Sequence, residues 1–337
     1  MTNPVLVEVI RGSLLESEHR GSAAVIDADG KPVLLLGDVA RPVFPRSAVK
    51  PLQALALVES GAADRFGFGN DELALASASH SGEPAHVASV ERMLARAGLD
   101  AGALACGAHP PIHAPSAQAL ARSGRDPSAL HNNCSGKHAG FLCAACAMGA
   151  DRAGYADPAH PVQREVKAAL EGIAGVALDD RSCAIDGCSV PTWPLPLEKL
   201  AYAFARFGTG RGLEPRRAGA AGRIRAACAA RPHLVAGTGR FCTRTMEHFG
   251  ERVLLKGGAE GVFCGALPQS GIGIAIKCED GAARAAEVVM AALISRLLVL
   301  DDADRAALAP LVRPALRNWN GIEVGGLRPS ELLAQRA

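Results

Sequence analysis

The order of strand-like and helix-like segments is the feature that most constrains how this chain can fold. Segments with strand patterning lie near both ends, and the long region between them reads as helices separated by polar loops. The predicted strands are residues 5–10, 22–26 and 33–36 at one end, and 253–256, 261–264 and 272–277 at the other. Strands and helices do not alternate, which argues against a parallel doubly wound sheet. We therefore predict an α+β fold in which both groups of strands pair in one antiparallel sheet flanked by helices.

The 337 residues are predicted to form a single catalytic unit. Residues 1–45 and 250–337 would form the sheet, and residues 46–249 would form a mainly helical part that carries most of the polar motifs. A long helix predicted at residues 287–300 would cover one face of the sheet, and the helical part would cover the other. The reactive motifs would then lie where the sheet meets the helical part.

The composition narrows the classes of partner. The formal charge is only +2 and no basic run occurs, so we predict no nucleic-acid partner. The most apolar window, residues 288–300, is interrupted by Arg296 and is too short to span a bilayer, so we predict no membrane segment. No signal segment follows Met1, so we expect a cytoplasmic protein whose ten cysteines are reduced thiols.

A serine and a lysine three residues apart, Ser47 and Lys50, stand at the start of a predicted helix. This spacing places both side chains on one helix face, where an unprotonated amine can take the hydroxyl proton and make the oxygen a nucleophile. Backbone N–H groups at the helix start would stabilise negative charge. The Ser-x-x-Lys pattern resembles that of the serine β-lactamases and penicillin-binding proteins. The alternative is a serine that only caps the helix.

Two further segments could contribute to the same chemistry. The loop at residues 77–83 offers a second hydroxyl, from Ser79 or Ser81, although it also reads as a solvated turn. Lys256 ends a predicted strand and is followed by two glycines, which would let a substrate approach the backbone closely. The alternative for Lys256 is an exposed lysine before a turn.

Cysteines and a lysine form a separate cluster in two polar loops. Two thiolates, Cys134 and Cys188, could hold a soft metal ion such as zinc, and a nearby carboxylate, Asp186, could orient a ligand. The spacing matches no standard zinc signature, so free loop cysteines remain an alternative.

Five stretches, taken together and in order, resemble the Rhizobium-type L-asparaginases, the thermolabile asparaginase II family. They cover residues 46–51, 79–83, 132–138, 186–192 and 256–261, and so extend over nearly the whole chain. Five motifs in order are far more specific than one. The resemblance implies a homodimeric enzyme with a β-lactamase-like and penicillin-binding-protein-like fold, which hydrolyses L-asparagine to L-aspartate and ammonia.

The resemblance also implies two Ser–Lys pairs. The first pair falls on Ser47 and Lys50, and the second on Ser79 and Lys256. Lys50 would deprotonate Ser47, which would attack the side-chain amide, release ammonia and leave an aspartyl ester for water to hydrolyse. Ser79 and Lys256 would relay protons or exchange roles with the first pair.

The same resemblance implies one zinc ion per chain, held by Cys134, Lys137 and Cys188, with Asp186 orienting a ligand. Because a serine supplies the nucleophile, this zinc would orient the substrate or the loops and would not need to generate hydroxide.

A small zwitterionic substrate needs one cation and one anion, and the candidates are Arg46 for its carboxylate and Glu83 for its ammonium group. Three alternatives remain open. The first is a glutaminase or another serine amidase or esterase. The second is a binding or penicillin-sensing protein of the same fold without catalytic activity. The third is a zinc-dependent hydrolase.

Overall fold

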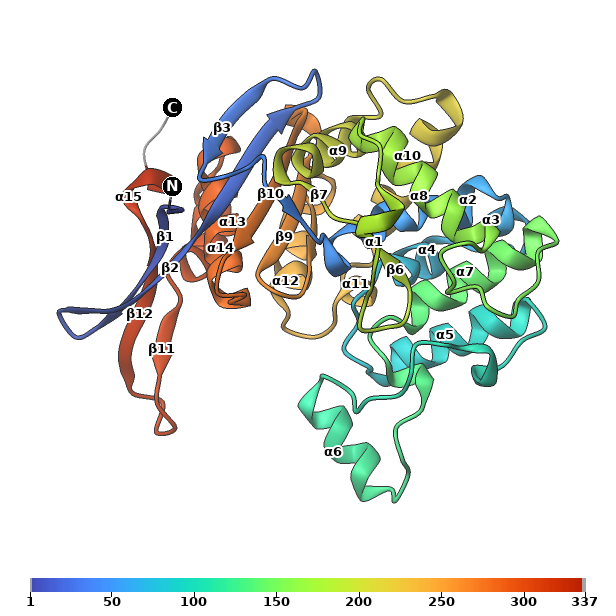
Figure 1. Cartoon of the computed structure of the whole chain (residues 1–337). Helices are drawn as coiled ribbons and strands as arrows, with labels where there is room; N and C mark the ends of the chain where they lie inside the picture. Colours follow the sequence, from blue (N-terminus) through green and yellow to red (C-terminus); the bar gives the residue numbers. More distant parts are fainter. Residues whose placement is uncertain (1, 335–337) are drawn as a thin grey trace. The chain divides into compact units, whose positions relative to one another are not determined.

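A computed structural model describes residues 2–334 of the chain, which folds as two compact units (Figure 1). The sheet unit comprises Met1–Ala48, Leu195–Thr209 and Arg252–Ala337, and the helical unit comprises Val49–Pro194 and Gly210–Glu251. The boundaries therefore lie a few residues beyond those predicted. In addition, residues 195–209, which the sequence placed in the helical part, belong to the sheet unit.

Within the described residues, the sheet unit is built on eight antiparallel strands in the order β11-β12-β1-β2-β10-β9-β8, with β3 also paired to β2. The strands are β1 (Val5–Arg11), β2 (Leu14–Asp27), β3 (Pro32–Leu36), β8 (Leu254–Gly257), β9 (Val262–Leu267), β10 (Ile272–Cys278), β11 (Ala315–Arg317) and β12 (Glu323–Pro329). The N-terminal and C-terminal strand groups join where β2 pairs with β10, with Val25 opposite Ile274. The predicted α+β fold with one antiparallel sheet is confirmed.

Two glycines show that helices pack on opposite faces of this sheet. Gly273 and Ile274 are neighbours on β10 and so point to opposite faces, and Gly265 lies opposite Ile274. A Cβ on Gly273 would lie 2.0 Å from the carbonyl oxygen of Ala201 in α9 (Leu197–Thr209), whereas one on Gly265 would lie 3.2 Å from Met290 in α13 (Ala283–Leu297). Helix α9 therefore covers one face and α13 covers the other.

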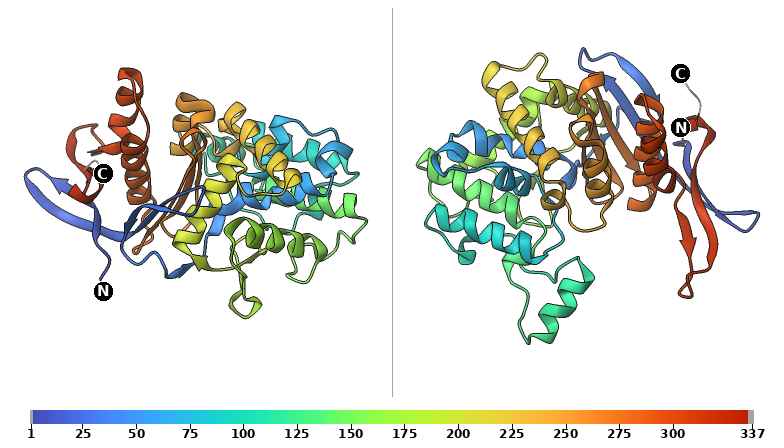
Figure 2. Two further views of the ribbon diagram at one scale, coloured as in Figure 1. Left: turned by 90° about the horizontal axis from the view of Figure 1, so that it is seen from above. Right: turned by 180° about the vertical axis from the view of Figure 1, so that it is seen from behind.

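Figure 2 shows α14 (Asp302–Val312) beside α13, with the β1–β2 and β11–β12 hairpins extending past them. The C-terminal hairpin was not predicted. Strand β12 contains two glycines and a proline, Gly325, Gly326 and Pro329, which disguise a strand in the sequence. It forms because β1 offers it a long edge, with Val9 opposite Leu327.

The helical unit is organised around the buried helix α7 (Ser135–Met148), whose residues 135–145 are buried on every side. The other α-helices of the unit's described residues are α1 (Lys50–Gln53), α2 (Leu55–Glu59), α3 (Ala62–Arg65), α4 (Asn70–Ala76), α5 (Pro84–Arg96), α6 (Ala114–Arg122), α8 (Pro161–Ala174), α10 (Pro215–Ala230), α11 (Pro232–Val235) and α12 (Phe241–Phe249). A Cβ on Gly136 would lie 2.4 Å from the Leu75 carbonyl oxygen, so only glycine lets α7 and α4 approach this closely. This close packing brings the loop after α4 next to the loop before α7.

Two short strand pairs lie outside the main sheet. Strand β4 (Pro42–Val43) pairs with β7 (Leu195–Pro196) in the sheet unit, and β5 (Ala184–Ile185) pairs with β6 (Pro191–Thr192) in the helical unit. Across residues 2–334, every helix is too short or too polar to cross a lipid bilayer.

Candidate active site

Lys50 is the first residue of α1 and one of the most deeply buried cations of the chain, with 1% of its surface exposed. Its Nζ atom lies 2.6 Å from the carbonyl oxygen of Ala78, 2.9 Å from the Oγ of Ser79 and 3.4 Å from the carbonyl oxygen of Asn133. These acceptors belong to the two loops that the packing of α4 on α7 brings together. The structure thus brings Lys50 together with Ser79, the serine that the family pattern pairs with Lys256.

Lys50 also interacts with the thiol of Cys134. Its three oxygen partners differ in what they can do for an amine. Backbone carbonyls only accept hydrogen bonds, whereas a hydroxyl can also donate. A neutral amine has two N–H groups and one lone pair. If its two N–H groups point to the carbonyls of Ala78 and Asn133, the lone pair faces the Ser79 hydroxyl. The arrangement therefore suits proton transfer from Ser79 to Lys50.

The segment that carries Ser79 is held in place by backbone hydrogen bonds on both sides. The Ser79 amide donates to the Val235 carbonyl at 3.0 Å, and the His80 amide donates to the Asn133 carbonyl at 3.2 Å. Asn133 was quoted in the family pattern without a role. Its backbone oxygen accepts hydrogen bonds from both His80 and Lys50. Because every residue has a backbone carbonyl, the sequence does not indicate this role.

His80 links the Ser79 segment to the start of α7. Its Nδ1 accepts from the Gly82 amide at 3.1 Å, so its Nε2 carries the proton and donates to Ser135 Oγ at 2.9 Å. Ser135 in turn donates to the Leu130 carbonyl. Burial, together with the nearby positive charges of His86 and Lys50, holds the pKa of His80 well below its usual value. His80 therefore acts as a neutral structural link at neutral pH.

The predicted metal ligands Cys134, Lys137 and Cys188 lie together and are all buried. Cys134 immediately precedes α7, Lys137 lies in its first turn, and Cys188 comes from the β5–β6 turn. Lys137 Nζ lies 3.0 Å from Cys188 Sγ. The hydrogen bond from Cys188 lowers the pKa of Cys134 against the effect of burial, and the Lys50 and Lys137 charges lower it further. The same hydrogen bond and burial raise the pKa of Cys188.

The chemistry of this donor set fits zinc. Two sulfur ligands and one nitrogen ligand are types that zinc prefers, and three protein ligands leave a coordination position open. Although burial acts in the opposite direction, the two thiol groups and the negative charge of Asp186 raise the pKa of Lys137. Asp186 lies in the same turn as Cys188, and its Oδ1 accepts from the Gly187 amide at 2.8 Å. A metal ion would have to displace the Lys137 proton.

Ser47, Lys256 and Arg46 belong to the sheet unit. Ser47 lies in the 3₁₀ helix η1 (Arg46–Val49) and is partly exposed, and the buried Lys256 lies in β8. A Cβ on Gly258 would lie 3.1 Å from both the Pro45 oxygen and the Ala48 nitrogen, so the turn after Lys256 packs against the Ser47 turn. The two predicted sheet-unit motifs are therefore neighbours.

Arg46 lines a cavity of about 470 Å³ in the sheet unit, together with Arg41, Glu260 and Lys277. Arg46 and Glu260 both have a positive φ, of 51° and 57°, which is rare for residues other than glycine. Such backbone conformations often accompany ligand sites. The position is compatible with the predicted role of Arg46 in binding a carboxylate.

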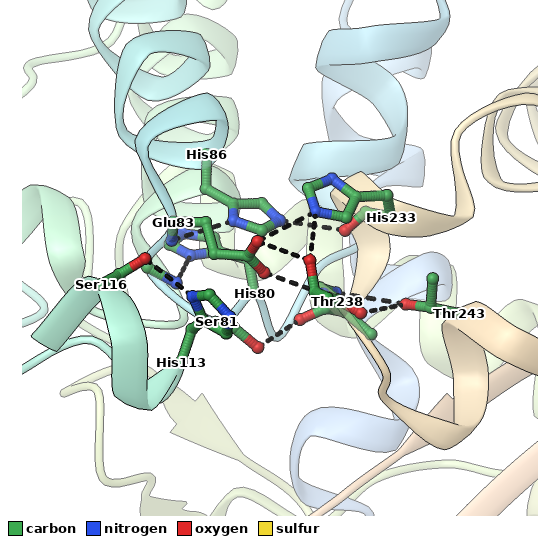
Figure 3. Close-up of polar contacts among 12 residues, drawn as sticks. His80, Ser81, Glu83, His86, His113, Ser116, His233, Thr238 and Thr243 are labelled. Atoms are coloured by element: carbon green, nitrogen blue, oxygen red, sulfur yellow. Dashed lines mark hydrogen bonds and ion pairs between the residues drawn. The ribbon is translucent and has the colours of Figure 1, made fainter.

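Glu83 is surrounded by hydrogen-bond donors (Figure 3). Its Oε1 accepts from the Thr238 amide at 2.8 Å, and its Oε2 accepts from the Thr238 hydroxyl at 2.7 Å and lies 3.2 Å from His233 Nε2. Burial alone would raise the pKa of Glu83, but these bonds lower it to about 2. Thr238 and His233 were not predicted, because the sequence between residues 195 and 250 carries no recognisable motif.

A serine hydroxyl beside a buried lysine amine, on an α+β fold, is an arrangement suited to acyl transfer. The sequence model of the family described as L-asparaginase II matches residues 7–329. The chain therefore belongs to the L-asparaginase II family, and this membership supports amidohydrolase activity. A comparison with curated proteins found no significant match.

Solved structures show a weaker similarity. A β-lactamase from Mycobacterium bovis is 18% identical over 79% of this chain and 89% of its own, with a TM-score of 0.39. A putative β-lactamase from Bacteroides dorei is 14% identical over 77% and 84%, with a TM-score of 0.40. A protein named Mglu is 16% identical over 84% and 69%, with a TM-score of 0.35. These scores are too low to assign a fold, which is defined here by the strand order.

Proposed function

We propose that this protein is an L-asparaginase, which hydrolyses L-asparagine to L-aspartate and ammonia through an acyl-enzyme formed on a serine and activated by a lysine. Membership in the L-asparaginase II family supports the reaction. The observation that carries the mechanism is the 2.9 Å distance between Lys50 Nζ and Ser79 Oγ, with two carbonyls directing the amine.

In the proposed mechanism, Lys50 takes the hydroxyl proton as the serine oxygen forms a bond to the side-chain amide carbon. The carbon–nitrogen bond then breaks, and Lys50 returns the proton to the departing ammonia. Water hydrolyses the aspartyl ester and regenerates the serine. The contacts of Lys50 favour Ser79 as its partner, whereas the family pattern assigns it to Ser47 and adds Lys256 to the catalytic set. The acylated serine is therefore the first point to test.

Substrate binding and the metal complete the proposal. Arg46 would bind the substrate carboxylate, and Glu83 is the sequence candidate for its ammonium group. Cys134, Lys137 and Cys188 would hold zinc, which would supply positive charge for orienting the substrate or the loops. We further propose that the protein forms a homodimer, as the family resemblance implies, and that it is cytoplasmic.

The decisive experiment is an ammonia-release assay with L-asparagine and L-glutamine as separate substrates, with and without a zinc chelator. We expect ammonia from L-asparagine, and a strong loss of activity in Lys50→Met while the protein stays folded. Glutamine is longer by one methylene group, so a preference for it would favour the glutaminase alternative. Absence of ammonia from either amide would refute the proposed function.

A further inference from the structure

We propose that Glu83 is a positioning residue, which holds the segment Ser79–Glu83 against residues 235–238 and so sets the place of the Ser79 hydroxyl beside Lys50. The proposal rests on the proposed function, because the Ser79 hydroxyl matters only if a reaction takes place there. It differs from the sequence-based role of Glu83, which was to bind the substrate ammonium group.

The first support is a series of contacts between the two segments. Alternate residues of the Ser79 segment each bond to the facing segment: Ser79 N to Val235 O at 3.0 Å, Ser81 Oγ to Ala236 O at 2.8 Å, and Glu83 to both the amide and the hydroxyl of Thr238. Three alternate residues of the Ser79 segment therefore contact residues 235–238, and Gly82, with a φ of 70°, turns the backbone between the last two of them. Glu83 is the last contact of this series.

The second support is the lack of space between the two segments. Gly237 has a φ of 121°, and a Cβ there would lie 2.5 Å from Ser81 Oγ and 2.6 Å from Glu83 Oε1. On its other side, the Gly237 carbonyl accepts from the Thr243 hydroxyl of α12 at 2.7 Å. The segment 235–238 is thus fixed by α12 behind it and by Glu83 in front of it.

The third support is the opposite edge of the Ser79 segment, which leads to Lys50. There the His80 amide donates to the Asn133 carbonyl, which also accepts from Lys50, and the His113 amide donates to the Ser81 carbonyl at 3.0 Å. A shift of the segment away from residues 235–238 would therefore change the distance between the serine and its amine. Because misplacement by about 1 Å can cost about 100-fold in rate, a modest shift would be visible in kinetics.

The histidines around Glu83 support a structural role. His86 Nδ1 accepts from the Glu83 amide at 3.1 Å, and His86 Nε2 lies 2.9 Å from the His233 carbonyl, with the rings of His80, His86 and His233 stacked (Figure 3). Glu83, His86 and His233 are close enough to hold a metal ion. However, both His86 nitrogens already have backbone partners, so a metal ion would have to break these hydrogen bonds.

The test compares Glu83→Gln, Thr238→Val and the double variant with the wild-type protein. Glutamine keeps the shape of the side chain but has no charge and only one acceptor oxygen, so it cannot accept from both the amide and the hydroxyl of Thr238. We expect Glu83→Gln to lower kcat by about 10- to 100-fold while KM changes by less than about 3-fold. The double variant should be no worse than Glu83→Gln, because both changes remove the same contact. Glu91→Gln, on the exposed face of α5, is the matched control.

A second readout does not depend on activity. Hydrogen exchange at the Ser79 amide should be faster in Glu83→Gln than in the wild-type protein, because the bond to Val235 is loosened. If Glu83→Gln does not accumulate as folded protein, Thr238→Val tests the proposal instead. It should lower kcat and speed exchange at the Ser79 amide, both by less than expected for Glu83→Gln. A KM raised by more than about tenfold at unchanged kcat would assign Glu83 to substrate binding and overturn the proposal. Unchanged kcat and unchanged exchange would overturn it as well. If the wild-type protein releases no ammonia, the proposed function fails, and hydrogen exchange alone decides the positioning role.

Discussion

The amine of Lys50 bonds to the hydroxyl of Ser79, which lies 29 residues further along the chain, at an Nζ–Oγ distance of 2.9 Å. The carbonyls of Ala78 and Asn133 lie 2.6 Å and 3.4 Å from the same nitrogen. To take the serine proton, the lone pair of the Lys50 amine must point at the hydroxyl. Carbonyls that accept the N–H groups of the amine would hold its lone pair in that direction. The first two predictions follow from this contact.

Replacing Lys50 with methionine should abolish turnover. Methionine has a similar length but no basic atom, so we expect kcat to fall by about 1,000-fold or more. The substitution also removes the Lys50 donor from the Ala78 carbonyl, which should cost about 1–3 kcal/mol of unfolding free energy, whereas the Asn133 carbonyl keeps its hydrogen bond from the His80 amide. Ammonia release and thermal unfolding would measure the two effects. Lys31→Met, at an exposed site, is the control, and near-normal turnover in Lys50→Met would contradict its role as the base.

Alanine variants of the two serines should reveal which one is acylated. If Lys50 activates Ser79, an acid-quenched reaction of Ser47→Ala with L-asparagine should still contain protein heavier by one aspartyl group, and Ser79→Ala should not. Intact-protein mass spectrometry measures this directly. The reverse result would assign the acyl group to Ser47, as the family pattern implies, and would leave Lys50 in contact with a serine that relays protons.

Much of the fold could be predicted from the sequence, because it depends on local patterns. The hairpin of β9 and β10 and the long helix α13 have clear periodicity, and the absence of alternation pointed to an antiparallel sheet. Strand β12 could not be predicted, because its glycines and proline carry no strand signal and only its pairing with β1 defines it. Helix α9 has a strong helical pattern and could be predicted. Its packing in the sheet unit depends on tertiary contacts, which the local pattern does not indicate.

The candidate site could be predicted only as a set of residue types. Local spacing suggested that Ser47 and Lys50 act together, whereas the contact from Lys50 to the Asn133 carbonyl spans 83 residues and involves a backbone atom. The residue type does not show which backbone carbonyl accepts a hydrogen bond. The partner of Glu83 at His233 is 150 residues away and lies in a stretch without motifs. Such pairings arise from how α4, α5 and α7 pack, and the spacing of residues along the sequence does not predict them.

The low pKa of Glu83 makes a prediction about stability and pH. Its pKa falls from a usual value of 4.5 to about 2 in the folded protein, so the folded state favours the carboxylate. This stabilisation is fully present above about pH 4.5 and is lost as the pH falls toward 2, and its size is about 3 kcal/mol. Glu83→Gln should therefore unfold more easily at pH 7, with a difference from the wild-type protein that shrinks as the pH approaches 2. Denaturant unfolding across this range would measure it, and a pH-independent difference would show that the charge is not responsible.

The contact between Gly273 and α9 makes a prediction about the fold. A Cβ at this position would lie 2.0 Å from the Ala201 oxygen and 2.3 Å from the Ala205 nitrogen, and backbone atoms cannot move aside easily. Gly273→Ala should therefore lower the unfolding free energy by about 3 kcal/mol. A Cβ on Gly219, on the exposed side of α10, would point into open space, so Gly219→Ala should stabilise the protein by about 0.5 kcal/mol. Equal effects of the two variants on denaturant unfolding would contradict the close packing of α9.

Zinc binding at Cys134, Lys137 and Cys188 should become tighter as the pH rises. The pKa of Cys134 is lowered, so this ligand loses its proton more readily than an ordinary thiol, whereas the pKa values of Lys137 and Cys188 are raised and both groups hold protons at neutral pH. Zinc must displace these protons, so its apparent affinity should increase by up to about 100-fold per pH unit below both pKa values. Competition with a chromophoric zinc chelator at several pH values would measure this slope. Cys188→Ser should weaken binding strongly, and Cys146→Ser, at a half-buried site on α7, should leave it unchanged. An affinity independent of pH, or protein without zinc after purification in its presence, would exclude this cluster as the zinc site.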